Sequence, residues 1–243
     1  MKRIPTKEDQ KKYYDSYWPK NISIGLHAKC RKEFIIANLA RIPTSNNPNI
    51  IDLGCGRGWL TAELAKHGNA VGVDLSDTGI NIAKRNYPQC HFKQMDIITE
   101  EIKDKYDVVV SSEVIEHLTE DNQIRYVKKI RDILVNDGYL ILTTPNATIA
   151  EKLVKYKIFK QEDLQPIENW VDKKEIYQLL NQYFEIKHIG STMFMPIFVQ
   201  KYHLFELSYR LFYHRLSLYK IINKLLKSSN KGLYLTVVAQ KVI

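Results

Sequence analysis

Residues 49–58, NIIDLGCGRG, decide the fold, because an apolar run leads directly into a loop with glycine at positions 54, 56 and 58. A short apolar run of this kind is typical of a strand buried in a parallel sheet. Glycine lacks a Cβ atom, so the backbone can turn tightly and approach a ligand closely. Residues 58–68 then predict a helix, and together these features indicate a strand–loop–helix unit.

The alternation of strand and helix continues along the chain. We predict strands at 69–74, 91–96, 106–112, 138–145, 184–192 and 233–241, and helices at 26–40, 76–86, 119–135 and 172–183. Strands that alternate with helices of this length are typical of an α/β protein with a doubly wound, parallel sheet and helices on both of its faces.

Sheets of this kind bind ligands beyond the carboxyl ends of their strands. Asp74 and Leu75 follow the second strand, Met95 and Asp96 close the third, and residues 111–117 follow the fourth. The helix that follows the glycine loop presents unpaired N–H groups at its first turn, which suit a carboxylate or a phosphate. Asp74 could accept hydrogen bonds from both hydroxyls of an adenosine ribose, and Asp96 could accept one from an adenine amino group.

The composition predicts one folded domain. Of the 243 residues, 44% are hydrophobic and 11% aromatic, which is enough for a sizeable core and excludes a disordered chain. No run approaches the ~18 apolar residues of a membrane span, and the first twenty residues lack a secretory apolar segment. Three cysteines are too few for a disulfide framework. We therefore expect a soluble protein in the reducing environment of the cytoplasm.

The formal net charge of +9 is concentrated at the two ends of the chain. Residues 1–32 carry a net charge of +6 and residues 196–243 carry +7, whereas the middle carries −4. Basic ends can attract phosphates, anionic lipids or acidic substrates. They can equally be lysine-rich helices whose charges serve solubility, and both interpretations stay open.

The motif Asp-x-Gly-x-Gly-x-Gly at 52–58, with the acidic residues at their intervals, resembles class I S-adenosylmethionine-dependent methyltransferases. The resemblance implies a seven-stranded, mostly parallel sheet with an antiparallel last strand, and it implies S-adenosylmethionine as cofactor and S-adenosylhomocysteine as product. By the resemblance, the glycine loop would lie under the methionine part of the cofactor, Asp74 on its ribose and Asp96 near its adenine. The candidate cofactor-binding residues are Asp52, Gly54, Cys55, Gly56, Gly58, Trp59, Asp74, Leu75, Met95, Asp96, Ser111 and Glu113.

The segment Glu113-Val114-Ile115-Glu116-His117 is similar to one in ubiquinone-biosynthesis O-methyltransferases and plant small-RNA 2′-O-methyltransferases. In those enzymes Glu-x-x-Glu-His supplies ligands to a divalent metal, which a histidine further along the chain completes. Here the corresponding stretch, 165–170, has no histidine, and His188 lies in a predicted strand. We therefore assign no metal.

His117 and Glu116 are the candidate catalytic residues. An imidazole titrates near neutral pH and can take the proton of an acceptor hydroxyl. The alternative is that this pair only ties the loop backbone.

The resemblance covers residues 49–145 well and about 26–243 by the order of the elements. We predict a single domain, 1–243, with an N-terminal helical lid at 1–45 and a helical insertion at 195–230. Tyr13, Tyr14, Tyr17 and Trp18 could fold over the cofactor, or they could pack on the sheet. Within the insertion, residues 197–228 have an aromatic stripe at helical spacing and a basic opposite face. This pattern suits a cap on the substrate pocket, a homodimer face or a contact with an anionic membrane surface.

Three functions agree with these observations. The first is transfer of a methyl group to an oxygen of a small molecule, such as a sugar, a quinone or another metabolite. The second is 2′-O or base methylation of RNA, which the positive charge and the 113–117 segment favour. The third is binding of the cofactor without catalysis. The sequence alone does not identify the methyl acceptor.

Overall fold

A computed structural model of the protein describes residues 5–19, 24–156, 165–194 and 229–242. The expected helical insertion at 195–230, including the basic segment 197–228, therefore lies almost entirely outside the described residues. No helix in the described ranges is both long enough and apolar enough to cross a bilayer.

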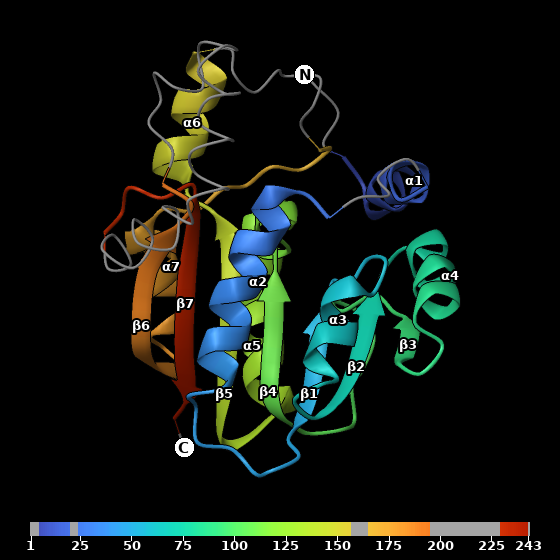
Figure 1. Cartoon of the computed structure of the whole chain (residues 1–243). Coiled ribbons are helices and arrows are strands. Elements are labelled where there is room, and N and C mark those ends of the chain that lie inside the picture. The colour runs from blue at the N-terminus through green and yellow to red at the C-terminus, as the bar shows by residue number, and fades with distance from the viewer. Residues whose placement is uncertain (1–4, 20–23, 157–164, 195–228, 243) are drawn as a thin grey trace.

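A single seven-stranded sheet forms the centre of the molecule (Figure 1). Its strands are β1 (Asn49–Leu53), β2 (Asn69–Asp74), β3 (His91–Gln94), β4 (Tyr106–Ser112), β5 (Leu134–Pro145), β6 (Phe184–Thr192) and β7 (Tyr234–Lys241). They lie in the order β3-β2-β1-β4-β5-β7-β6. β7 runs antiparallel to both β5 and β6, whereas the other pairs are parallel. The predicted fold class is confirmed.

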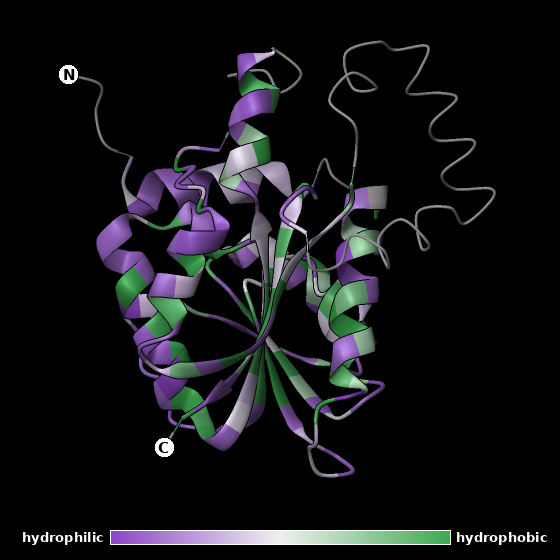
Figure 2. Cartoon of the chain, turned by 90° about the vertical axis from the view of Figure 1, so that its left-hand side faces the viewer, coloured by the Kyte–Doolittle hydropathy of each residue, from purple (hydrophilic) through white to green (hydrophobic). Residues whose placement is uncertain are grey.

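Helices cover both faces of the sheet (Figure 2). The alternation of side chains along β1 explains why. Ile50 packs with residues of α2 (Leu26–Leu39) and α3 (Trp59–Leu64). Its neighbour Ile51 points to the opposite face, where it packs with residues of α5 (Glu120–Ile133) and α7 (Lys173–Leu180). The strand is apolar on both faces because both faces are buried.

The remaining helices are α1 (Lys7–Tyr17), α4 (Asp77–Asn86), α6 (Ala147–Lys155) and the 3₁₀ turn η1 (Ile115–His117). α4 packs on β3 through Ile80, Ala83 and Phe92. α1 lies beside α4, above the carboxyl ends of the parallel strands (Figure 1). It begins at a capping box, in which Thr6 and Asp9 exchange hydrogen bonds.

Several element boundaries differ from the prediction. The third strand ends at Gln94 rather than at 96, and the helix predicted at 172–183 ends at Leu180. The helix after the glycine loop ends at Leu64 rather than at 68. The helix predicted to reach 135 ends at Ile133, because Leu134 turns into an extended conformation and pairs with Tyr106 as the start of β5. Leu134 is fully buried, so tertiary packing overrides the helical pattern at this position.

Tyr126 and Ser111 join α5 to the middle of the sheet. The Tyr126 hydroxyl donates a hydrogen bond to Ser111 Oγ over 2.9 Å, and both side chains are completely buried. A buried hydroxyl without a partner loses the free energy that water would have supplied.

We predict that Ser111→Ala lowers the free energy of unfolding by about 1–3 kcal/mol, because it leaves the Tyr126 hydroxyl unpaired. The double variant Ser111→Ala/Tyr126→Phe should recover part of that loss, since no hydroxyl is then left without a partner. Urea unfolding of the two variants and of Tyr126→Phe alone measures both effects. Additive losses would contradict a coupling between the two side chains.

Candidate active site

A cavity of about 810 Å³ opens at the carboxyl ends of β1, β2 and β4, beneath α1. This volume is in the upper part of the range for small-molecule sites, about 300–1,000 Å³. Of the residues predicted to bind cofactor or to act in catalysis, eleven line the cavity: Asp52, Gly54, Cys55, Trp59, Asp74, Leu75, Met95, Asp96, Glu113, Glu116 and His117. Gly56, Gly58 and Ser111 are not among its lining residues.

The glycine loop has left-handed backbone conformations that side chains disfavour. The φ angles of Gly54, Gly56 and Gly58 are +74°, +52° and +78°. A Cβ atom on Gly56 would lie 2.6 Å from the indole ring of Trp18, at the end of α1. The loop therefore combines backbone angles that glycine adopts without strain with a close approach of Trp18, and both require glycine.

Asp74 joins the end of β2 to the glycine loop. Its carboxylate accepts hydrogen bonds from the backbone N–H groups of Gly56 and Ser76, each over 2.8 Å. Burial raises the pKa of Asp74 to about 6, although these hydrogen bonds act in the opposite direction. Leu75 adds a further backbone contact. A carboxylate has about four acceptor positions, so Asp74, which lines the cavity, keeps acceptor capacity for a ligand.

Asp52 and Asp96 flank this carboxylate along the sheet. Asp52 accepts a hydrogen bond from the Thr61 hydroxyl over 2.6 Å, and burial raises its pKa to about 7. For Asp96, burial alone would raise the pKa, but contacts with Lys7 and Thr99 lower it overall. The Lys7 ammonium lies 2.6 Å from Asp96 Oδ2. Lys7 of α1 thus pairs with one of the two carboxylate oxygens of Asp96.

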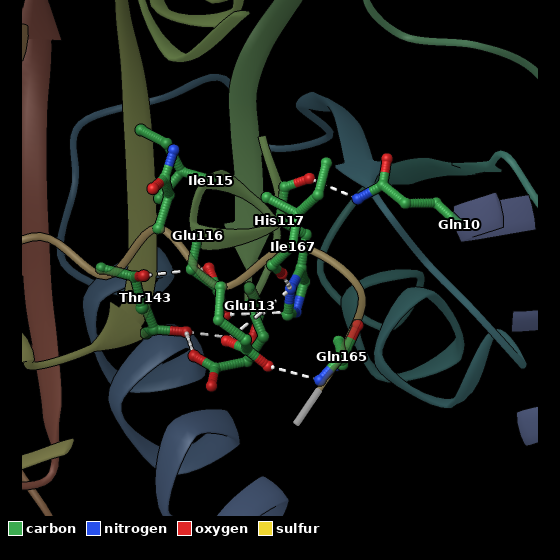
Figure 3. A network of polar contacts seen from close by, with 12 residues as sticks. Gln10, Glu113, Ile115, Glu116, His117, Thr143, Gln165 and Ile167 are labelled. Carbon is green, nitrogen blue, oxygen red and sulfur yellow. Dashed lines mark hydrogen bonds and ion pairs between the residues drawn. The ribbon is translucent and has the colours of Figure 1, made fainter. Parts of the chain in front are cut away.

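The segment after β4 brings two carboxyls and an imidazole together (Figure 3). Glu113 has a positive φ of 60°, unusual for a residue other than glycine and common where a site holds strain. The Thr144 hydroxyl donates to Glu116, whose Oε1 lies 3.7 Å from His117 Nε2. Burial raises the pKa of both glutamates to about 8.

The imidazole of His117 is oriented by a backbone carbonyl. His117 Nδ1 lies 3.0 Å from the oxygen of Ile167. A carbonyl oxygen only accepts hydrogen bonds, so this geometry assigns the proton of the neutral ring to Nδ1. Nε2 is then the atom with a lone pair, and the side chain faces the cavity.

α1 covers the cavity through polar contacts along its length. Gln10 donates a hydrogen bond of 2.5 Å to the backbone oxygen of His117 (Figure 3). Asp15 accepts from the Ser76 hydroxyl over 2.6 Å, and Lys11 lies 2.6 Å from Asp77. The Tyr14 ring meets that of His117 edge-on, with 6.2 Å between ring centroids.

Several cavity residues escaped the sequence analysis, namely Lys7, Gln10, Arg31, Arg57, Glu168, Trp170 and Tyr234. They come from the two N-terminal helices, the glycine loop, the segment before α7 and the last strand. For Arg31, the only signal was an arginine within the apolar pattern of a helix. Arg57 lies within the glycine motif, where the sequence analysis assigned roles only to its neighbours. The others carried no local motif, because folding brings them to the site from distant parts of the chain.

The donor set does not fit the divalent metal that the resemblance implies. Among the described residues, no three His, Cys, Asp or Glu side chains lie so that they could hold a metal ion. Glu168 stands in the stretch where a histidine was expected, with Oε2 4.0 Å from His117 Nδ1. His188 lies elsewhere, against Phe34 beside α2. The Arg31 guanidinium lies 3.6 Å from Glu113.

The family model described as a methyltransferase domain matches residues 27–189, which is more than half of the chain. The chain belongs to this methyltransferase family. Its cofactor is S-adenosylmethionine, and the cavity that contains the glycine loop and Asp74 is the candidate site for it.

Known relatives of this methyltransferase support the assignment. The ubiquinone biosynthesis O-methyltransferase of Rickettsia prowazekii is 27% identical over 215 residues, which cover 80% of this chain and 83% of that protein. The enzyme of the same name from Coxiella burnetii is 30% identical over 110 residues, 42% of this chain and 46% of that protein. In shorter matches such as this one, the chain spans less than half of the curated relative's length.

Solved structures of methyltransferases share the fold. Magnesium protoporphyrin IX methyltransferase from Synechocystis, solved with bound S-adenosylhomocysteine, matches with a TM-score of 0.66 and 16% sequence identity. The match covers 97% of this chain and 99% of that one. At this level of identity the likeness concerns the fold alone.

We predict that Gly56→Ala weakens binding of S-adenosylhomocysteine by about tenfold or more, because the new Cβ strains the loop and displaces Trp18. Isothermal titration calorimetry measures the affinity. Lys84→Ala is the control, since Lys84 is exposed on α4 and does not line the cavity. Equal affinities for the two variants would contradict the role given to the loop.

Proposed function

We propose that this methyltransferase transfers the methyl group of S-adenosylmethionine to a hydroxyl oxygen of a small molecule. The observation that carries the proposal is the orientation of His117. The contact with Ile167 leaves Nε2 as the proton acceptor, on a side chain that lines the cavity. Methylation of an alcohol or phenol oxygen needs such a base, whereas a neutral amine needs little help.

For the cofactor, we propose the arrangement that the resemblance implies. The ribose hydroxyls would use the remaining acceptor capacity of Asp74, and the methionine part would lie over the glycine loop. Cys55, Leu75 and Met95 offer apolar contacts, and Cys55 and Met95 are buried. Asp96 would approach the adenine with the oxygen that does not face Lys7.

In the reaction, the acceptor oxygen attacks the methyl carbon and the bond from that carbon to the sulfonium sulfur breaks. S-adenosylhomocysteine leaves with the electron pair of that bond, and the hydroxyl proton passes to His117 Nε2. The positive charge on the imidazole would favour the ionised form of Glu116, 3.7 Å away. The protein's main contribution is alignment of donor and acceptor and exclusion of water.

We further propose that the N-terminal segment 1–45 acts as the lid of a single domain, 1–243. The support is that Lys7, Gln10 and Asp15 contact residues that follow β3, β4 and β2, so α1 joins three strand ends above the cavity. The lid would close after the cofactor enters.

Incubation with S-adenosylmethionine labelled in its methyl group tests the reaction, with mixtures of phenols, quinols and sugars in one arm and of amines in the other. We expect S-adenosylhomocysteine to form and the label to appear as a base-stable ether. Label on amines alone would contradict O-methylation. Binding of the cofactor without turnover in either arm would favour the non-catalytic alternative.

We predict that His117→Gln lowers kcat by about 10²–10⁴-fold, because the base is lost, while the affinity for S-adenosylhomocysteine stays close to that of the wild type. Turnover with an acceptor from the screen and calorimetry measure the two quantities. A loss of affinity comparable to the loss of turnover would show that His117 serves the structure of the loop instead.

A second prediction concerns pH. The ionised Asp74 accepts hydrogen bonds, so the affinity for S-adenosylhomocysteine should fall as the pH drops through about 6, where Asp74 gains a proton. Two other carboxyls lie close to Asp74. The charge of Asp15 raises the pKa of Asp74, and Asp74 in turn raises the pKa of Asp52. Asp74→Asn should bind more weakly at neutral pH and lose the part of the fall near pH 6. An unchanged pH profile in this variant would contradict the assignment.

A further inference from the structure

Arg31 places a positive charge in the part of the cavity where the family resemblance implies a metal. It lies on the second turn of α2, and only 14% of its side chain is exposed. It lines the same cavity as Glu113, Glu116 and His117. Burial of a guanidinium costs several kcal/mol unless other groups compensate for the lost water, so its presence there needs an explanation.

The surroundings of Arg31 hold the guanidinium in place. Its Cζ atom lies 4.6 Å from the centroid of the Tyr234 ring, in a cation–π contact. The Tyr234 hydroxyl is in turn 2.8 Å from His27 Nδ1. Tyr234 is itself buried, at the start of β7. The Arg31 guanidinium thus packs on the Tyr234 ring, and the contact with His27 holds that ring in place.

These contacts do not use all of the hydrogen-bonding capacity of Arg31. A guanidinium has five N–H donors. The Arg31 Nε atom is buried and has no hydrogen-bond partner in the described part of the chain. The 3.6 Å between Arg31 Nη1 and Glu113 Oε2 exceeds the ~2.7–2.9 Å of a charge-assisted hydrogen bond. Nε is itself shielded from the cavity, and the Tyr234 hydroxyl is already a hydrogen-bond partner of the guanidinium. The donors that a molecule in the cavity could reach are therefore the remaining N–H groups of the two terminal nitrogens.

The neighbouring groups restrict what such a molecule can be. A divalent cation would be repelled by the guanidinium. A phosphate dianion would meet the carboxyls of Glu113 and Glu116 as well as the arginine. A carboxylate carries a single charge and matches the planar fork of a guanidinium with two parallel hydrogen bonds. Trp170, which also lines the cavity, is an aromatic side chain on which an aromatic ring could pack.

We propose that Arg31 is a specificity-determining residue, which binds a carboxylate of the methyl acceptor where related enzymes use a divalent metal. The inference rests on the proposed function, since it assigns the acceptor side of the same cavity. Arg31 would hold the acceptor by its acidic group and leave the hydroxyl to face His117.

The test uses the full-length protein saturated with S-adenosylhomocysteine, with benzoate as the probe and benzamide as its neutral counterpart. We expect calorimetry or ligand-observed NMR to show benzoate binding at least about tenfold more tightly than benzamide, since a charge-assisted pair is lost in the amide. Arg31→Met should abolish this preference. Arg31→Lys, which keeps the charge and loses the fork, should retain part of it.

Lys29→Met is the matched control, because Lys29 lies on the same helix and is exposed. It should keep the preference of the wild type for benzoate. Equal binding of benzoate and benzamide by the wild type would overturn the proposal, and so would no benzoate binding or an unchanged preference in Arg31→Met.

A metal titration provides an independent arm. We expect no saturable binding when Mn²⁺ is added to the wild-type complex. Saturable Mn²⁺ binding that is lost in Glu116→Gln would show that the site takes a metal, and it would overturn the proposal.

Failure of the proposed function remains distinguishable from failure of this inference. A protein that does not bind S-adenosylhomocysteine refutes both. A protein that binds it normally but does not distinguish benzoate from benzamide refutes only the role of Arg31.

Discussion

The site depends on one buried carboxylate that ties two strand ends together. Asp74 closes β2, and its two oxygens accept from the backbone of Gly56, in the loop after β1, and of Ser76, at the start of α4. The hydrogen bond from Gly56 to Asp74 fixes the path of the glycine loop. The positive φ angles of this loop are ones that no other residue type adopts as readily as glycine. The same carboxylate faces the cavity, so the group that shapes the loop is also positioned to recognise a ligand. Its raised pKa reflects the cost of that burial.

The second determinant of the cavity is α1, which converts an open sheet edge into an enclosed site. The helix is polar, and no residue in it is fully buried, so it is held by contacts at particular points rather than by a core of its own. Trp18, just after the helix, approaches Gly56 and Gly79 closely. The ion pairs that Lys7 and Lys11 of α1 make with Asp96 and Asp77 are partly exposed, and such pairs each contribute little to stability. A helix attached in this way could open and close at modest cost, which agrees with the lid role proposed for it.

The sheet, most of its covering helices and the strand ends that line the cavity could be predicted because they depend on local patterns. A buried strand must be apolar, a tight loop needs glycine, and an acidic residue at a strand end is visible in the sequence. Arg31, Tyr234 and Trp170 could not be predicted in the same way, since their roles arise from the meeting of α2, β7 and the segment before α7. The start of β5 at Leu134 was missed because packing against Tyr106 outweighs helical periodicity. The same holds for the metal site that the resemblance implies. The sequence shows that a histidine is missing from 165–170, but only the fold shows that Arg31 lies beside Glu113.

The most direct test of the account is a crystal structure of the protein with S-adenosylhomocysteine. The account predicts the ligand inside the cavity, with both ribose hydroxyls hydrogen-bonded to Asp74 and the sulfur facing the segment from Glu113 to His117. α1 would lie across the ligand, and Gly56 and Ser76 would keep their bonds to Asp74. A ligand bound outside this cavity, or one whose ribose makes no contact with Asp74, would contradict it.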